Sequence, residues 1–232
     1  MVGLPSPAFA QTPLAVVEPD CASEVEAALH PRTSPTLDGS AIANLQENAC
    51  FALLEASGVA YSRLASADAG GVEMPIRLDG RLDGVRVASR GHSELHEIMD
   101  CRLAVALLHW APILRDAGVA SLLHYSTYRP GARVGGTEQV SGHAGALAID
   151  LAVVVFEDGT EIEVLTGWES RDRGTPPCSG IHEESERSAA LRRLVCSTAE
   201  VFQIVLTPHY DAAHANHVHL ELRPSVTWSY LR

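Results

Sequence analysis

The sequence predicts one α+β domain, because helical and strand patterns are mixed along the chain and two neighbouring strands pair in antiparallel fashion. The strand pair consists of the strongly apolar segment 146–156 and the segment 161–165, joined by the turn residues 157–160. Apolar periodicity predicts helices at residues 38–58, 93–118 and 185–205.

Capping residues set the expected ends of the first two helices. Ser40 is placed to cap the first helix and Gly58 to end it, while Ser93 and Gly118 bound the second. Pro112 predicts a kink in that second helix. Further strands are expected at residues 59–65, 119–128 and 217–223.

The N-terminal segment differs in composition from the rest of the chain. Residues 1–37 are rich in Pro, Ala and Ser and predict a linker ahead of a domain that spans residues 38–232. Ala8-Phe9-Ala10 fits the end of a secretory signal, although no basic region and no full apolar region precede it. We interpret this segment as either a signal remnant or a chance match.

Composition excludes several classes of protein. The formal net charge is −12, so no basic surface for nucleic acid is expected. No stretch approaches the roughly eighteen apolar residues of a membrane helix, so no membrane span is expected. None of the five cysteines lies in a C-x-x-C pair, which argues against a zinc ribbon. With the signal-like segment they favour an oxidising compartment, periplasmic or extracellular, and one or two disulfides.

The segment HYDAAHANHVHLEL, residues 209–222, holds four of the eleven histidines of the chain. Alternate side chains of a strand share a face, so His217, His219 and Glu221 point one way and the apolar residues between them face the core. Imidazole is the commonest metal ligand among side chains. One histidine of the pair can bind a metal while the other reaches a metal-bound water or a substrate; both can bind only if they lean together.

Partners for such a metal lie in the segment VSGHAGALAIDLAV. His143 lies in a glycine-flanked loop, and Asp150 lies within the apolar strand, where an unpaired charge is costly. A catalytic zinc takes about three protein ligands, so His143, Asp150 and one of His217 and His219 form a candidate set. The alternative is that Asp150 pairs with Arg129 or caps a loop, and that the histidines line a solvated edge.

Ser141-Gly142-His143, Asp150 and the downstream H-x-H together resemble the LAS zinc peptidases, which include lysostaphin-type enzymes, D-Ala-D-Ala carboxypeptidases and murein endopeptidases. Within that group the chain is most similar to the bacterial extensin-like C-terminal domain. The likeness covers about residues 45–222 and includes GVEMPIRLDGRLDGVRV, CRLAVALLHW, YSTYRPG and SGHAGALAIDL. It implies a Hedgehog/D,D-peptidase-like α+β fold, with a central antiparallel sheet and flanking helices.

The resemblance also implies a ligand set and a base. His143, Asp150 and His219 would bind Zn²⁺, and His217 would orient or deprotonate the zinc-bound water. The carboxypeptidases have a glutamate three residues before the last ligand, where this chain has Asn216. An amide cannot act as a base, so His217 is the remaining candidate.

Three further residues take substrate-related roles by the same resemblance. Arg129 would clamp a substrate carboxylate or carbonyl, and Ser141 would hydrogen-bond near the same place. His214 matches a further histidine of the murein endopeptidases, whose pattern H-x-x-H-x-H is present here, and is assigned to substrate binding.

The expected disulfides also depend on the resemblance. Extensin-like domains usually have a cysteine after the YS dipeptide, where this chain has threonine, so Cys196 lacks its usual partner. We expect Cys196 to pair instead with Cys178 of the preceding loop; the alternative is that both thiols are reduced and buried as small apolar groups. A second pair would join Cys21 to Cys50 and leave Cys101 free.

The remaining histidines are given structural roles. His92 and His96 have i, i+4 spacing but lack the glutamate of zincins, so a solvated helix face is expected. His109 and His124 lie in apolar runs and are expected to be hydrogen-bonded core histidines. His182 is expected to be exposed in a polar loop.

These observations lead to two hypotheses about function. The resemblance implies a monomeric, periplasmic or secreted zinc hydrolase that cleaves stem or cross-link peptides of cell-wall peptidoglycan; the residues alone indicate metal-assisted hydrolysis. The rival is a non-catalytic wall-binding or scaffolding module that keeps zinc for structure. Three protein ligands and an open position favour the enzyme, whereas direct binding by His217 or His214 favours the module.

Overall fold

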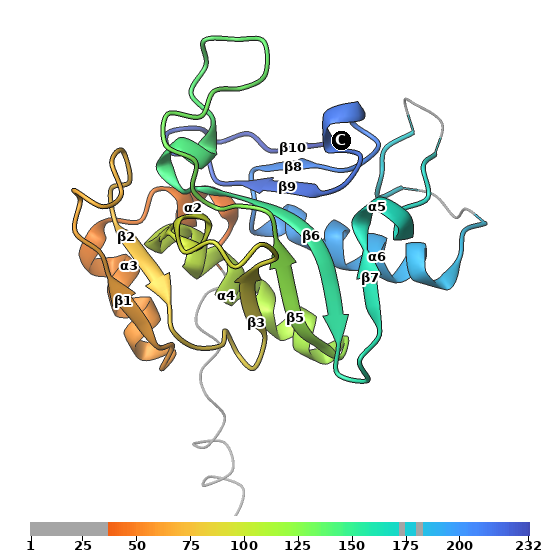
Figure 1. Ribbon diagram of the computed structural model, residues 1–232, viewed down its shortest axis with the longest axis horizontal. Coiled ribbons are helices and arrows are strands. Elements are labelled where there is room, and N and C mark those ends of the chain that lie inside the picture. The colour runs from red at the N-terminus through yellow and green to blue at the C-terminus, as the bar shows by residue number, and fades with distance from the viewer. Residues whose placement is uncertain (1–36, 172–174, 180–182) are drawn as a thin grey trace, which may run out of the picture. The chain divides into compact units, whose positions relative to one another are not determined.

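The computed structural model describes residues 37–171, 175–179 and 183–232. The expected linker with its signal-like segment, Cys21 and His182 lie outside these residues. The described residues form a mixed α+β body with a seven-stranded and a three-stranded sheet (Figure 1). None of the helices in this part of the chain is long and apolar enough to cross a membrane.

The large sheet has the strand order β10-β8-β9-β6-β5-β3, with β7 beside β6. Its strands are β3 (Arg86–Ser89), β5 (Val119–His124), β6 (Ala148–Phe156), β7 (Glu161–Glu163), β8 (Ile204–Leu206), β9 (Val218–Glu221) and β10 (Tyr230–Leu231). The antiparallel arrangement predicted for it is correct at the centre, and the predicted hairpin is present as β6 and β7. It is wrong at both edges, where β3 runs parallel to β5 and β10 runs parallel to β8.

The helices explain one of these parallel edges. The helices are α2 (Gly39–Ala43), α3 (Glu47–Ala56), α4 (Cys101–Asp116), α5 (Val164–Gly167) and α6 (Glu186–Ser197). Parallel neighbours need a long crossover, and α4 supplies it between β3 and β5. Helices α4 and α6 contact each other behind the large sheet (Figure 1). The small sheet consists of β1 (Tyr61–Arg63), β2 (Pro75–Leu78) and β4 (Met99–Asp100).

Helix boundaries differ from the prediction because other residues act as caps. The first predicted helix is two helices, α2 and α3, and Asp38 caps α2 in place of Ser40. Helix α4 begins at Cys101 rather than after Ser93, because the buried Asp100 carboxylate accepts a hydrogen bond from the backbone N–H of the second helical residue. The third predicted helix ends at Ser197, and its expected last turn forms β8.

Two hydrophobic clusters hold the body together. The larger one combines Ile149, Leu151 and Val154 of β6 with the buried faces of α3, α4 and α6. The smaller one contains Ala69, Val72, Ile98, Tyr128 and Ala146. This second cluster fixes the loop before β2 against the segment that leads into β6.

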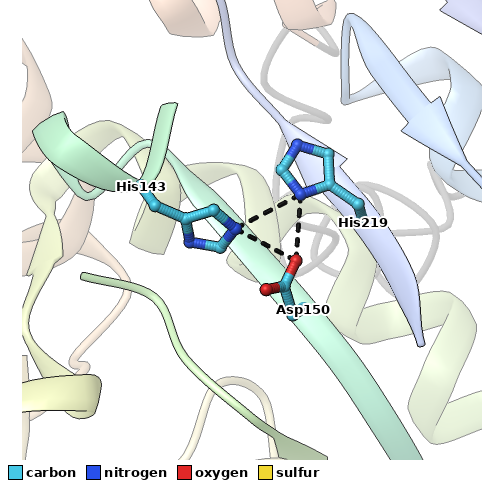
Figure 2. A group of neighbouring side chains, drawn as sticks. All are labelled: His143, Asp150 and His219. Carbon is cyan, nitrogen blue, oxygen red and sulfur yellow. Dashed lines mark hydrogen bonds and ion pairs between the residues drawn. The ribbon is translucent and has the colours of Figure 1, made fainter. Parts of the chain in front are cut away.

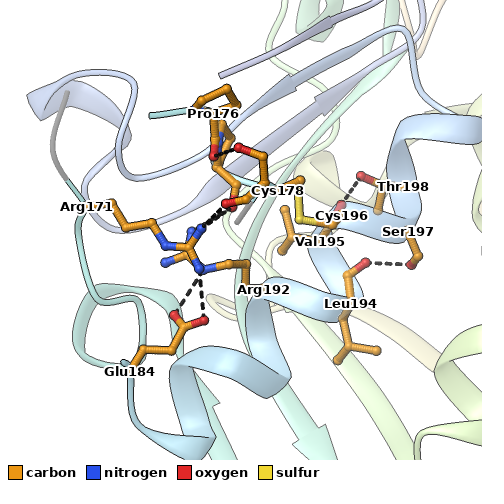
Figure 3. Close-up of a disulfide and its surroundings, with 12 residues drawn as sticks. Arg171, Pro176, Cys178, Glu184, Arg192, Leu194, Val195, Cys196, Ser197 and Thr198 are labelled. Atoms are coloured by element: carbon orange, nitrogen blue, oxygen red, sulfur yellow. Dashed lines mark hydrogen bonds and ion pairs between the residues drawn. A yellow bond between two sulfur atoms is a disulfide. The ribbon is translucent and has the colours of Figure 1, made fainter. Parts of the chain in front are cut away.

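The described residues contain two disulfides. Cys178–Cys196 joins the loop before α6 to that helix, as predicted, beside an ion pair between Arg192 and Glu184 (Figure 3). The second bridge joins Cys50 of α3 to Cys101 at the start of α4. The predicted Cys21–Cys50 pair and free Cys101 are therefore wrong. Sequence spacing did not show that α3 packs against the first turn of α4.

The two bridges are expected to contribute differently to stability. Removing Cys50–Cys101 with a double alanine variant should lower the free energy of unfolding by about 4 kcal/mol, because the bridge spans 51 residues and restricts the unfolded chain. The matched Cys178/Cys196 double variant should lose about 3 kcal/mol, since its bridge spans 18 residues. Denaturant unfolding measures both values. A larger loss for the shorter bridge would contradict the chain-entropy argument.

Candidate metal centre

Three donor side chains meet where β6 and β9 run side by side (Figure 2). Asp150 of β6 lies directly opposite His219 of β9 in the ladder. His143 comes from a short 3-10 helix, Gly142–Gly145, which leads into β6. The Asp150 Oδ1 atom lies 3.0 Å from His143 Nε2 and 2.9 Å from His219 Nδ1, and the two nitrogens are 3.3 Å apart.

The spacing of these donors fits a metal ion. Zinc ligands at about 2.0–2.1 Å in tetrahedral geometry lie about 3.3 Å from one another, close to the three separations found here. All three residues are buried. Two imidazoles and one carboxylate form a nitrogen and oxygen set that suits a borderline transition-metal ion. The His143, Asp150 and His219 side chains can therefore hold a metal.

Hydrogen bonds on the far side of each imidazole select the nitrogen that faces the centre. The His143 Nδ1–H donates to the backbone carbonyl of Thr127 at 3.0 Å, which leaves Nε2 as the donor toward the site. The His219 Nε2–H donates to Glu221 Oε2 at 2.9 Å, so the neutral ring presents Nδ1 to the centre. Such outer partners fix tautomer and ring orientation at metal sites.

The electrostatics of this group favour positive charge. Burial acts to lower the pKa of His219, but hydrogen bonds to Asp150 and Glu221 outweigh burial and raise that pKa to about 9. Burial acts to raise the pKa of Asp150, but its interactions with His143 and His219 outweigh burial and hold that pKa well below its usual range. The two carboxylates therefore create a place for a cation at the centre of the group.

His217 lies next to the ligand group without belonging to it. The donor atoms that lie within 4.8 Å of one another belong to His143, Asp150 and His219. The His217 Nδ1–H donates to Asn216 Oδ1 at 2.8 Å, so its Nε2 carries the lone pair. This Nε2 lies 3.4 Å from Asp150 Oδ1. Burial lowers the pKa of His217 to about 4, so the ring is neutral near pH 7.

The other predicted site residues line one cleft of about 550 Å³ together with Asp150 and His219, whereas the fully buried His143 is not among its lining residues. Arg129 is half exposed, and its Nη2 lies 3.6 Å from Asp150 Oδ2. The Arg129–Asp150 ion pair, which was an alternative to the metal site, is therefore present together with the contacts of Asp150 to the histidines. Ser141 Oγ accepts a 3.4 Å hydrogen bond from the His143 backbone and so caps the short helix. The His214 Nδ1–H donates to Asp211 Oδ1 at 2.6 Å. We call this cleft the metal cleft.

Glu221 and Gly142 are site residues to which the sequence pattern gave no role. The H-x-H-x-E alternation placed Glu221 on the face of His219, which was the signal for its role. Gly142 lies against the same carboxylate. A Cβ atom on Gly142 would lie 2.6 Å from Glu221 Cδ, closer than real Cβ contacts allow. Glycine at this position therefore leaves room for the carboxylate that orients His219.

We expect Gly142→Ala to weaken metal binding about 10- to 100-fold, because the new methyl group displaces the Glu221 carboxylate from His219. Glu221→Gln should have a loss of similar size, since an amide is a weaker hydrogen-bond acceptor. Gly145→Ala is the matched control, as its Cβ would meet no atom closer than 3.7 Å. Competition with a chromophoric chelator measures the affinities. Equal affinities for the two alanine variants would refute the role of Gly142.

His92, His96 and His124 show how the remaining histidines compare with their predicted roles. The expected helix face with His92 and His96 is wrong, because His92 has φ 52° and His96 lies in a separate 3-10 turn. His124 of β5 is buried as predicted, but its Nδ1 has no hydrogen-bond partner within the described part of the chain. Burial lowers the pKa of His124 to about 4.

This lowered pKa predicts a dependence of stability on pH. The unfolded chain, with a pKa near 6.5, binds a proton that the folded His124 does not bind until pH falls to about 4. Stability from this residue is therefore full above pH 6.5 and falls by about 3 kcal/mol as pH drops toward 4. Unfolding in chelator at several pH values should show a shallower loss for His124→Leu than for wild type. The exposed His92→Asn control should follow wild type.

Comparison with known proteins identifies a family for this chain. The model of the family described as extensin-like protein C-terminus matches residues 48–232. Neither the curated proteins nor the solved structures contain a match. The family match includes α4, the whole large sheet and all three residues of the candidate metal centre. The chain belongs to the extensin-like C-terminal family.

Proposed function

We propose that this protein is a zinc-dependent hydrolase that cleaves peptide bonds in cell-wall peptidoglycan. The observation that carries the proposal is the convergence of three donors, two of which line the metal cleft, beside a neutral histidine that lies outside the donor group. The resemblance of the H…D…H-x-H pattern to LAS peptidases supports the substrate class. The same resemblance supports a Hedgehog/D,D-peptidase-like fold.

The donor set supports zinc as the metal. Three protein ligands from histidine and a carboxylate are typical of catalytic zinc sites, which keep one position for water or substrate. A bound zinc ion supplies a Lewis acid for the scissile carbonyl and lowers the pKa of its water to about 7. The outer hydrogen bonds of His143 and His219 keep both rings in the orientation that such an ion needs.

His217 is proposed to move the proton. Its Nε2 carries a lone pair and faces the Asp150 carboxylate, because Asn216 holds the Nδ1–H. A neutral imidazole in this position accepts a proton from the nucleophilic water and passes it to the leaving amine. Asn216, which replaces the glutamate of the carboxypeptidases, therefore serves as a positioning residue.

Substrate contacts are proposed for three residues of the metal cleft. Arg129 offers a half-exposed guanidinium, which suits a substrate carboxylate or carbonyl. Ser141 lines the cleft while its Oγ caps the His143 turn. His214, held by Asp211, faces His217 with ring centroids 5.1 Å apart and binds the substrate on that side.

The cellular setting of the proposal is the periplasm or the exterior of the cell. The two disulfides are typical of oxidising compartments, where peptidoglycan is also accessible. The protein is proposed to act there as a monomer on stem or cross-link peptides.

A structural zinc module is the second candidate function. The 3.4 Å separation between His217 Nε2 and Asp150 Oδ1 favours it, because a small shift would make His217 a fourth ligand. A closed four-ligand site has no position for water and would serve wall binding or scaffolding without catalysis.

Metal analysis combined with digestion of purified peptidoglycan tests the proposal. We expect one zinc per chain and release of peptides whose masses identify the cleaved bond. Chelator should stop the release, and added zinc should restore it. Stoichiometric zinc without any released product would favour the structural module.

A further inference from the structure

A second cleft lies next to the metal cleft. It has a volume of about 480 Å³, and five of its lining residues are glycines: Gly70, Gly71, Gly131, Gly142 and Gly145. We call it the glycine cleft. The two clefts share Ser141, Glu221 and Arg223 as lining residues. Glu221, which accepts the hydrogen bond of His219, therefore borders both of them.

Gly70 has no local reason to be glycine. Gly71 and Gly131 have φ of 87° and 67°, a conformation that favours glycine, and Gly142 lies against Glu221. Gly70 is not among the residues with positive φ, and a Cβ on it would meet no atom within 4 Å. A side chain at this position would not disturb the packing, but it would fill this side of the glycine cleft.

The wall that carries Gly70 is fixed in place. The Tyr128 hydroxyl donates a 2.8 Å hydrogen bond to the Gly70 carbonyl. Ala69 and Val72, on either side of the two glycines, are buried with Tyr128 in the smaller hydrophobic cluster. The cleft is thus formed before any ligand arrives, as is usual for binding sites.

The two clefts differ in charge. Arg129 and Arg133 line only the metal cleft, whereas the glycine cleft has Glu221 and Arg223 as its charged lining residues. Those two form an ion pair at 2.5 Å with each other. The rest of the glycine cleft is glycine, serine, alanine or apolar, including a Val140 side chain that is 57% exposed. Such a surface suits an uncharged chain with small side chains.

We infer that the glycine cleft is a second substrate subsite. It binds the part of a peptide that is neutral and has small side chains, while the part on the other side of the scissile bond lies in the metal cleft. A substrate that occupies both clefts extends in both directions from the metal centre. The bond that is cut is then internal, as in a cross-link between two stem peptides, rather than the last bond of a chain. This inference rests on the proposed function and narrows its substrate class.

Three phenylalanine variants test the inference. Gly70→Phe fills the glycine cleft, and Gly135→Phe fills the metal cleft from a position that also has room for a side chain. Gly91→Phe is the matched control, since Gly91 has the same backbone freedom and lines neither cleft. Binding of fluorescently labelled muropeptides is measured on zinc-loaded full-length protein that also carries His217→Ala, so that the probes stay intact.

The probes are a cross-linked muropeptide dimer and its uncross-linked monomer. Gly70→Phe should weaken binding of the dimer at least about tenfold and leave that of the monomer unchanged, because only the dimer reaches the glycine cleft. Gly135→Phe should weaken both, and Gly91→Phe neither. An equal effect of Gly70→Phe on both probes, or no effect on either, overturns the inference.

The proposed function is judged by a separate result, the release of peptides by the protein with intact His217. Release from peptidoglycan together with unchanged dimer binding in Gly70→Phe would overturn only the second subsite. Selective loss of dimer binding without any hydrolysis would support the subsite and overturn the hydrolase.

Discussion

Asp150→Asn is expected to abolish stoichiometric zinc binding, and His143→Ala is expected to do the same. Each change leaves two of the three donors, and two ligands hold zinc poorly in competition with water. Asp150 has the stronger effect of the two, because its Oδ1 contacts both ligand histidines and its charge favours a cation at the centre. The asparagine retains the size of the side chain, so the change tests charge and ligation rather than packing.

Metal content of the purified variants, measured per chain, checks this expectation. Asp158→Asn is a suitable control, since this residue lies in the turn after β6 and is exposed. Unfolding curves in chelator must show that each variant folds. One tight zinc per chain in either Asp150→Asn or His143→Ala would show that the ligand set is wrong.

The central strands of the large sheet could be predicted from the sequence, because the residues that contact each other there also have recognisable local patterns. The segment that forms β6 is apolar except for Asp150, and β9 alternates between apolar and polar residues, so both strands are recognisable in isolation. A charged Asp150 inside the first and histidines on one face of the second require each other. The pattern left His217 and His219 open as the third donor, and the resemblance favoured His219. The structure supplies the antiparallel register that places Asp150 opposite His219.

Other parts of the fold depend on contacts between distant segments that no local pattern reveals. Strands β8 and β10 are short, and β8 follows helix α6 so closely that its apolar residues continue the helical pattern. The start of α4 depends on Asp100, whose carboxylate also accepts a hydrogen bond from the distant Met74 backbone. The Cys50–Cys101 bridge depends on the packing of α3 against α4.

The outer parts of the candidate site follow the same rule. Thr127 orients His143 through a backbone carbonyl, for which residue identity carries no signal. Gly142 is explained only when Glu221, far along the chain, is known to lie against it. The sequence therefore indicated the three candidate donors, whose chemistry is specific, but not the groups that hold them in place.

His217→Ala is expected to retain zinc and lower kcat by about 10²- to 10⁴-fold, whereas His219→Ala is expected to lose both zinc and activity. The reason is the different position of the two rings. His219 Nδ1 is one of the three donor atoms, while His217 Nε2 lies outside the donor group and is near the Asp150 carboxylate. The size of the activity loss is that of a removed acid–base group. Zinc content and peptide release from peptidoglycan are measured on the same preparations.

Asn216→Ala adds a test that separates position from ligation. This change removes the acceptor of the His217 Nδ1–H, so the ring can turn and its lone pair no longer faces the Asp150 carboxylate. Zinc content should stay at one per chain while kcat falls, by less than in His217→Ala, and KM changes little. Equal zinc loss in His217→Ala and His219→Ala would instead make His217 a fourth ligand, because a closed site needs every one of its donors to hold the metal.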